Sequence, residues 1–155
     1  MTAAPAFPVD FMALAFGEAE AAGARGEVPV GAVIVDAISG EILARAGNET
    51  EARSDPTAHA EILVIRAAAA KVAAPRLAGC DLYVTLEPCA MCAAAASMAR
   101  LRRVVYGAYD PKGGGVDHGA RIFAQATCHH RPEVVGGVGA SRAEALLKEF
   151  FAVRR

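Results

Sequence analysis

Two short segments of the chain contain the side chains most suited to catalysis. The first is His59-Ala60-Glu61, and the second, about thirty residues later, is Pro88-Cys89-Ala90-Met91-Cys92. One imidazole and two thiolates can bind a zinc ion, and three protein ligands leave the fourth position of a tetrahedral ion for water. The glutamate remains as an unligated carboxylate that can move protons. The sequence therefore predicts a catalytic site with one Zn²⁺ per chain, bound by the histidine and the two cysteines.

Two helix starts are expected to position these ligands. Asp55 can cap free amides and Pro56 suits the first position of a helix, so that His59 falls in the first turn. Pro88 predicts the start of a second helix in the same way. The two cysteines, three residues apart, then share one helix face, where the helix dipole favours thiolates.

A Cys-x-x-Cys pair by itself has two other interpretations, a redox dithiol or half of a structural zinc knuckle. A closed structural zinc would need a fourth protein ligand, and no second pair of ligands at short spacing lies near the first. The other cysteines are expected to be buried small apolar residues and the other histidines to lie in loops or on the surface. These residues are Cys80, Cys128, His118, His129 and His130.

Two glutamates lie near the predicted metal ligands. Glu61 is two residues beyond a ligand and can reach a zinc-bound water without binding the ion. Glu87 follows a predicted strand and precedes Pro88, a position that favours a hydrogen-bonded structural carboxylate. Glu61 is therefore the predicted catalytic residue.

Hydrophobic periodicity predicts alternating helices and strands. Helices are expected over residues 11–22, 57–72, 90–100 and 141–153, the last capped by Ser141, and strands over 30–35, 42–46, 81–86 and 103–106. The last two strands bracket a helix, which indicates a parallel β-α-β crossover. The glycine-rich residues 112–119 are expected to form a loop, most simply a flexible connection. The predicted fold class is α/β, with a mixed central sheet and helices on both faces.

Composition and charge limit the class of protein. A chain of 155 residues with 54% hydrophobic and 21% charged residues can form one core, so residues 1–155 are predicted to be one domain. No segment is apolar enough to span a membrane and no signal segment begins the chain, which predicts a cytoplasmic protein.

The net charge of −1 excludes a generally basic nucleic-acid-binding protein, but the charge is uneven. Residues 100–155 carry ten Lys/Arg against five Asp/Glu, whereas residues 1–99 carry six against twelve. The basic residues either form a phosphate-binding surface or are ordinary solvated charges. They include Arg100, Arg102, Arg103, Lys112, Arg131, Arg154 and Arg155.

Segments along nearly the whole chain after about position 9 resemble the bacterial tRNA-specific adenosine deaminases of the cytidine-deaminase-like superfamily. The similar segments are Glu27–Val33, Asn48, Asp55–Glu61, Tyr83–Cys89, Arg103–Ala108 and Phe150-Phe151. The chain departs from better-known members in the loop 109–119 and lacks their longer basic tail.

This resemblance implies a cytidine deaminase-like three-layer α/β/α fold, a homodimer, and deamination of the wobble adenosine in a tRNA anticodon stem-loop to inosine. Zinc-bound hydroxide would attack C6 while Glu61 carries protons to ring N1 and to the leaving amine. Asn48 would contact the base, unless it is only a turn residue after a strand, and Val30 and Leu86 would wall the pocket. Candidate RNA contacts are Asp110, Lys112, Arg154 and Arg155.

Two rival functions remain open. A deaminase of free guanine, cytosine or nucleosides would use the same zinc, although the guanine branch usually has Cys-Glu-Pro-Cys where this chain has Leu86-Glu87-Pro88-Cys89. A zinc-stabilised RNA-binding module without turnover would not need Glu61.

Overall fold

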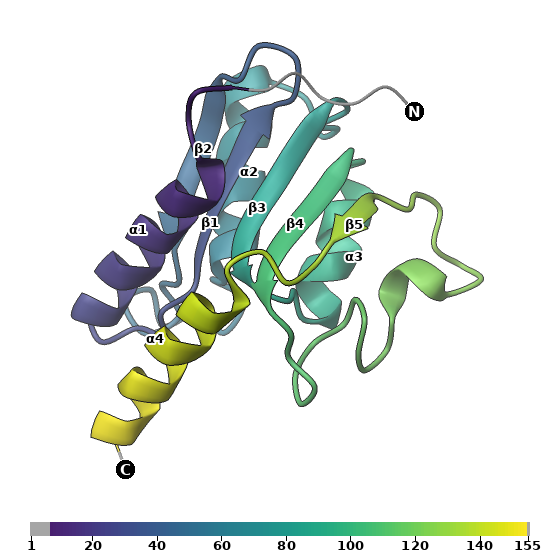
Figure 1. Cartoon of the computed structure of the whole chain (residues 1–155). Helices are drawn as coiled ribbons and strands as arrows, with labels where there is room; N and C mark the ends of the chain where they lie inside the picture. Colours follow the sequence, from purple (N-terminus) through teal and green to yellow (C-terminus); the bar gives the residue numbers. More distant parts are fainter. Residues whose placement is uncertain (1–6, 155) are drawn as a thin grey trace.

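A five-stranded sheet forms the centre of the structure, a computed structural model that describes residues 7–154 (Figure 1). The strand order is β2-β1-β3-β4-β5. The bounds are β1 Gly31–Asp36, β2 Ile42–Gly47, β3 Cys80–Leu86, β4 Arg103–Ala108 and β5 Glu133–Val135. β1 is antiparallel to β2 and β3, whereas β3, β4 and β5 are parallel. The predicted mixed sheet and the parallel crossover from β3 to β4 are confirmed.

Helices cover both faces of the sheet. The bounds are α1 Phe11–Ala24, α2 Ala60–Val72, α3 Ala90–Met98 and α4 Ala140–Val153, with a short 3-10 helix, η1, at Ile122–Ala124. α1 and α4 lie on one face and α2 and α3 on the other (Figure 1). None of the helices in residues 7–154 has both the length and the hydropathy needed to cross a membrane.

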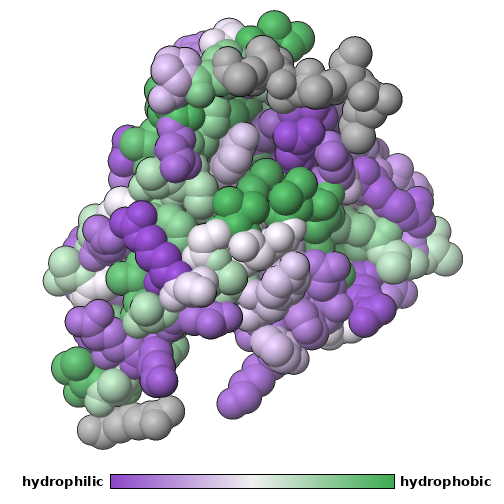
Figure 2. All heavy atoms as spheres, viewed as in Figure 1, coloured by the Kyte–Doolittle hydropathy of each residue, from purple (hydrophilic) through white to green (hydrophobic). Residues whose placement is uncertain are grey.

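Alternating side chains of the strands divide the core into two apolar layers. In β1, Ala32 and Ile34 pack with α2 and α3, whereas Val33 and Val35 pack under α1. On the α1 side, hydrophobic side chains gather in the middle of the face, over β3 and β4 (Figure 2). The arrangement is the expected three-layer α/β/α fold.

Of the two helices beside the predicted ligands, α2 begins at Ala60, later than the predicted residue 57, whereas α3 begins at Ala90 as predicted. His59 and Cys89 are the extended residues that precede α2 and α3, and neither lies inside the first turn. Asp55 does not cap α2, because its carboxylate accepts hydrogen bonds from the backbone N–H and the hydroxyl of Thr57 at 2.9 and 2.7 Å. The aspartate therefore forms a local turn and the helix starts one turn further on.

Two further features differ from the prediction. α4 begins at Ala140 after Gly139, whose φ of 74° is a conformation that glycine adopts freely, and Ser141 is not its cap. β5 has three residues, too few for a periodic signal, and it is aligned by the pair between Arg103 Nε and Glu133 Oε2 at 3.0 Å.

Candidate active site

Three predicted ligands meet where α2 and α3 begin. Nδ1 of His59 lies 3.6 Å from Sγ of Cys89 and 3.4 Å from Sγ of Cys92. The three ligand atoms lie within 4.8 Å of one another. Ligands bound to tetrahedral zinc at about 2.0–2.3 Å are separated by about 3.5–3.8 Å, so these side chains fit that ion.

The cluster has three protein ligands among the described residues. Cys80 is buried in the core, and Cys128 is half-buried with its Sγ 3.2 Å from the His130 carbonyl. His118 binds the carboxylate of Glu87 instead. No fourth side chain of residues 7–154 joins the cluster, which is the pattern of a catalytic zinc and not of a closed structural site.

The electrostatic environment of the two cysteines favours a metal dication at the cluster. The neighbouring Cys92 thiol and then the His59 ring lower the pKa of Cys89 to about 4, although burial opposes this shift. The hydrogen bond with Cys89, and then burial, raise the pKa of Cys92. The protein groups alone therefore stabilise one thiolate, and a metal dication at the helix starts would stabilise both.

A cavity of about 340 Å³ opens beside the cluster. Its wall includes the three residues predicted to contact substrate, Asn48, Val30 and Leu86. It also includes Asp110, one of the candidate RNA contacts. The lining residues are Val28, Val30, Asn48, Thr50, His59, Glu61, Leu86, Glu87, Cys89, Asp110 and Gly113. Sequence analysis missed Val28, Thr50 and Gly113, whose only signal was their nearness to predicted residues.

Glu61 and Glu87 both border the cavity but differ in their hydrogen bonds. Glu61 is 4% exposed in the first turn of α2, and burial raises the pKa of its carboxyl because the charged form loses hydration. Glu87 accepts hydrogen bonds from the loop after β4, as a structural carboxylate should. Burial opposes its ionisation, but the hydrogen bonds, first that from Asp110, hold the pKa of Glu87 below its usual range.

Asn48 lies where β2 ends, with 7% of its surface exposed. Its backbone N–H donates to the Val30 carbonyl at 3.0 Å, and its side-chain amide donates to the Thr50 hydroxyl at 3.4 Å. Asn48 therefore follows a strand and also faces the cavity, where its polar side chain is held beside the apolar wall of Val30 and Leu86.

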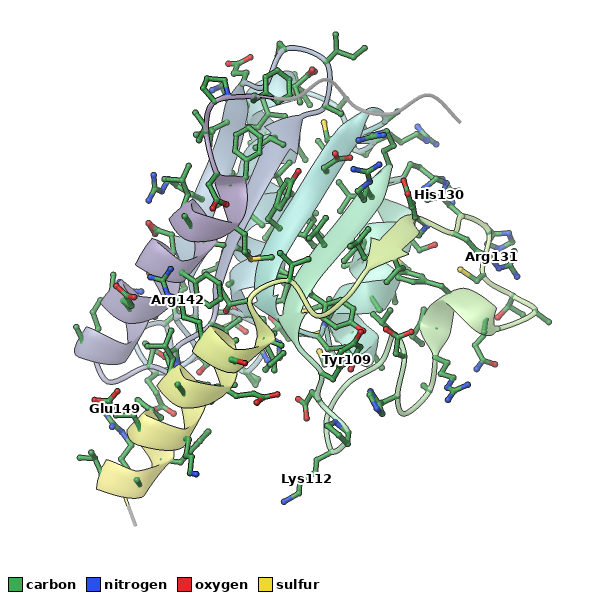
Figure 3. The ribbon with its side chains drawn as sticks, viewed as in Figure 1. Tyr109, Lys112, His130, Arg131, Arg142 and Glu149 are labelled. Atoms are coloured by element: carbon green, nitrogen blue, oxygen red, sulfur yellow. The ribbon has the colours of Figure 1, made fainter. Side chains whose placement is uncertain are left out.

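A groove of about 670 Å³ adjoins the cavity and shares Val28, Leu86 and Asp110 with it. Lys112 lines this groove, and so does Lys148 of α4, which sequence analysis did not single out. Tyr109 and Phe151 add aromatic surface to the same groove. Tyr109 and Lys112 lie on the loop below β4, and the Lys112 side chain extends away from the body of the protein (Figure 3).

The structure does not gather the other basic residues at the cavity. Arg102 pairs with Asp81, and Arg103 pairs with Glu133. Both pairs lie at the start of β4, and the predicted zinc ligands lie near the other end of this six-residue strand, about 20 Å away. Arg154 stacks on Phe150 in a separate hollow. Arg155 lies outside the described residues.

The model of the cytidine and deoxycytidylate deaminase zinc-binding region matches residues 7–108. The chain is 55% identical to the tRNA-specific adenosine deaminase of Agrobacterium fabrum, over 94% of each chain. The chain belongs to the tRNA-specific adenosine deaminases of the cytidine and deoxycytidylate deaminase family. The three-ligand cluster of this deaminase lies within the matched zinc-binding region and forms a possible zinc site.

Solved structures support the same relation. This deaminase matches a structure from work on A-to-I editing by tRNA:A34 deaminases, at 56% identity and a TM-score of 0.85, over 88% of this chain and 98% of that one. A guanine deaminase from Nitrosomonas europaea matches at 25% identity and a TM-score of 0.81, over 97% and 87%. The fold therefore accommodates more than one purine substrate.

Purified protein should contain about one zinc ion per chain, and Cys89→Ser or His59→Ala should lose the ion and part of the thermal stability, because each removes a ligand. Cys128→Ser is the matched control, since Cys128 lies outside the cluster. Elemental analysis and thermal denaturation measure both effects. A folded, active preparation without zinc would contradict the assignment.

Proposed function

We propose that this deaminase hydrolyses the wobble adenosine of a tRNA anticodon stem-loop to inosine and ammonia. The proposal rests above all on one observation: Glu61 and two of the three predicted zinc ligands, His59 and Cys89, line a single base-sized cavity that adjoins a groove with two lysines. The similarity to tRNA-specific adenosine deaminases over most of the chain supports the choice of RNA. A single-stranded loop presents an unpaired base that can enter such a cavity.

The zinc ligands would be His59, Cys89 and Cys92. When bound there, zinc supplies a Lewis acid that lowers the pKa of a coordinated water from about 15.7 to about 7. Glu61 takes a proton from the attacking water and delivers it to ring N1, which makes C6 electrophilic. It then takes the remaining water proton from the hydroxyl on C6 and gives it to the departing amine, so that the oxygen stays on C6 as a carbonyl and ammonia leaves.

The other cavity residues would select and orient the base. Asn48 offers an amide that can hydrogen-bond to the edge of adenine, and Val30 and Leu86 supply apolar walls for its faces. Asp110 at the shared border of cavity and groove would contact the nucleotide on the RNA strand beside the target. Lys112 and Lys148 would face the phosphates.

A homodimer is part of the proposal. Met98 at the end of α3 is 76% exposed, and a hollow of about 360 Å³ lies beside it, bordered by Ala94 and Cys128. An exposed apolar side chain beside a small-residue helix suits packing on a second copy of α3. Sedimentation at micromolar concentration should show a dimer, and a fully active monomer would reject this part of the proposal.

We further propose that residues 1–155 act as one zinc-dependent deaminase domain. A location in the cytoplasm, where tRNA is the available substrate, stays a prediction from the sequence.

A guanine deaminase is the specific rival, because a protein of that activity shares the fold at a TM-score of 0.81. The experiment is to measure inosine in a synthetic anticodon stem-loop with adenosine at the wobble position, and ammonia release from free guanine, with the same enzyme preparation. Conversion of the stem-loop with no reaction of guanine is expected. Ready conversion of guanine with an unreactive stem-loop would replace the proposed substrate and keep the zinc chemistry.

Glu61→Gln should keep fold and zinc but lower turnover by at least about a hundredfold, because the amide cannot carry the protons. Single-turnover assays on the stem-loop measure the loss, and elemental analysis verifies the zinc. Glu41→Gln is the control, because the Glu41 side chain is exposed and pairs with Lys71 at the start of β2. This variant should retain full turnover. Near-normal turnover of Glu61→Gln would remove the role that we assign.

Stem-loop binding should weaken steeply as salt rises, and Lys112→Ala should weaken it several-fold and reduce the salt slope by about 1, because one phosphate contact is lost. Lys71→Ala is the matched control, since Lys71 pairs with Glu41 on another part of the surface. Binding titrations at several salt concentrations give both numbers. Equal slopes for the two variants would place the phosphate contacts elsewhere.

A further inference from the structure

The loop after β4 is folded onto one buried carboxylate. The side chain of Glu87 has 0% exposed surface. Its Oε1 accepts from the backbone N–H of Asp110 at 2.9 Å and lies 2.7 Å from Nδ1 of His118. Its Oε2 accepts from the backbone N–H groups of Val116, Asp117 and His118 at 3.2, 2.9 and 3.1 Å. One side chain thus binds both ends of residues 110–118.

The glycines of this segment are needed for close packing, and the expectation of a flexible connection is wrong. A Cβ on Gly114 would lie 2.4 Å from Oε2 of Glu87, and one on Gly115 would lie 2.4 Å from the backbone nitrogen of Ala90. The N–H of Gly115 also donates to the Pro88 carbonyl at 2.7 Å. The segment therefore lies directly against the start of α3, which carries the zinc-binding cysteines.

The same segment forms part of the cavity wall. Asp110 accepts from the N–H groups of Lys112 and Gly113 at 3.2 and 2.9 Å, which makes a tight turn, and both Asp110 and Gly113 line the cavity. At its other end, Asp117 accepts a hydrogen bond from the hydroxyl of Tyr106, a fully buried residue of β4. Glu87 accepts four backbone hydrogen bonds from the segment, beside the Gly115–Pro88 hydrogen bond and the buried side chain of Val116.

We infer that Glu87 is a positioning residue of the deamination: it holds residues 110–118 in place so that Asp110 and Gly113 can receive the RNA. This inference rests on the proposed function. Both oxygens of Glu87 are taken by the segment, so that the residue acts through the cavity wall and not on the reacting carbon. Glutamine keeps one acceptor oxygen but would place an N–H₂ group against the backbone N–H of Asp110 or against those of residues 116–118, so that one end of the segment would lose its hydrogen bonds.

In the proposed complex Asp110 and Gly113 would contact the RNA strand, whereas Glu61 and the zinc would act at C6 of the target base. A displaced wall removes binding contacts that are equal in the ground state and the transition state, and this loss raises KM with little change in kcat. A purely structural defect would instead lower the amount of active enzyme and leave KM unchanged. KM and kcat measured separately therefore distinguish the two roles, whereas kcat/KM would fall in both cases.

The experiment compares Glu87→Gln with Asp81→Asn. Asp81 is a matched control because it is a buried carboxylate, 1% exposed, near the start of β3, the strand that Glu87 follows, and it pairs with Arg102 at 2.9 Å, away from the cavity-lining residues. For Glu87→Gln we expect a rise of at least about tenfold in KM for the stem-loop, kcat within about threefold, one zinc per chain, and faster hydrogen exchange at residues 110–118. For Asp81→Asn we expect a lower Tm with unchanged KM.

An unchanged KM in Glu87→Gln, with wild-type enzyme active on the stem-loop, would overturn the inference and leave the proposed function standing. If wild-type enzyme leaves the stem-loop unreacted, both are wrong. Gly114→Ala tests the same wall with Glu87 intact, since its Cβ would push the segment off the carboxylate. This variant should show the same rise in KM even if Glu87→Gln fails to fold, and a normal KM in it would also overturn the inference.

Discussion

The site depends on the meeting of two helix starts at one edge of the sheet. β3, α3 and β4 form a parallel crossover, which places the end of β3 and the beginning of α3 together at the carboxyl edge. α2 lies on the same face and brings His59 to that point. Since both helices direct free N–H groups and a positive dipole end at the cluster, the backbone favours the thiolates that a zinc ion requires.

Three buried carboxylates, two in the cavity wall and one next to lining residue Val28, differ in the hydrogen-bond donors available to them. Glu27, 2% exposed, accepts from the backbone N–H groups of Glu51 and Ala52 at 3.1 and 2.8 Å and so holds the segment that carries Thr50. Glu87 does the same for the loop after β4. Glu61 lies beside the predicted metal ligands instead, the position that we propose for proton transfer. Two of the carboxylates thus hold loop segments in place, and the third is the one to which we assign the chemistry.

Net charge says little about RNA binding in this protein. Several basic residues after residue 100 are already paired within the protein. Arg102 pairs with Asp81, and Arg131 donates to the backbone carbonyl of Phe123. The cations at the groove are Lys112 and Lys148, which come from a loop and from α4. A small number of placed charges next to an aromatic groove is the arrangement that single-stranded RNA requires.

The ligand types, their spacing and the element order could be predicted from local pattern, because His-x-Glu, Pro-Cys-x-x-Cys and the apolar periodicities are contained in short windows. The start of α2 was misplaced because Asp55 finds a hydrogen-bond partner two residues away, a competition that capping rules do not resolve. β5, the anchoring of residues 110–118 by Glu87 and the place of Lys148 beside Lys112 required the folded chain. Each of these depends on contacts between segments about thirty or more residues apart, and a sequence window has no means of measuring such a distance in space.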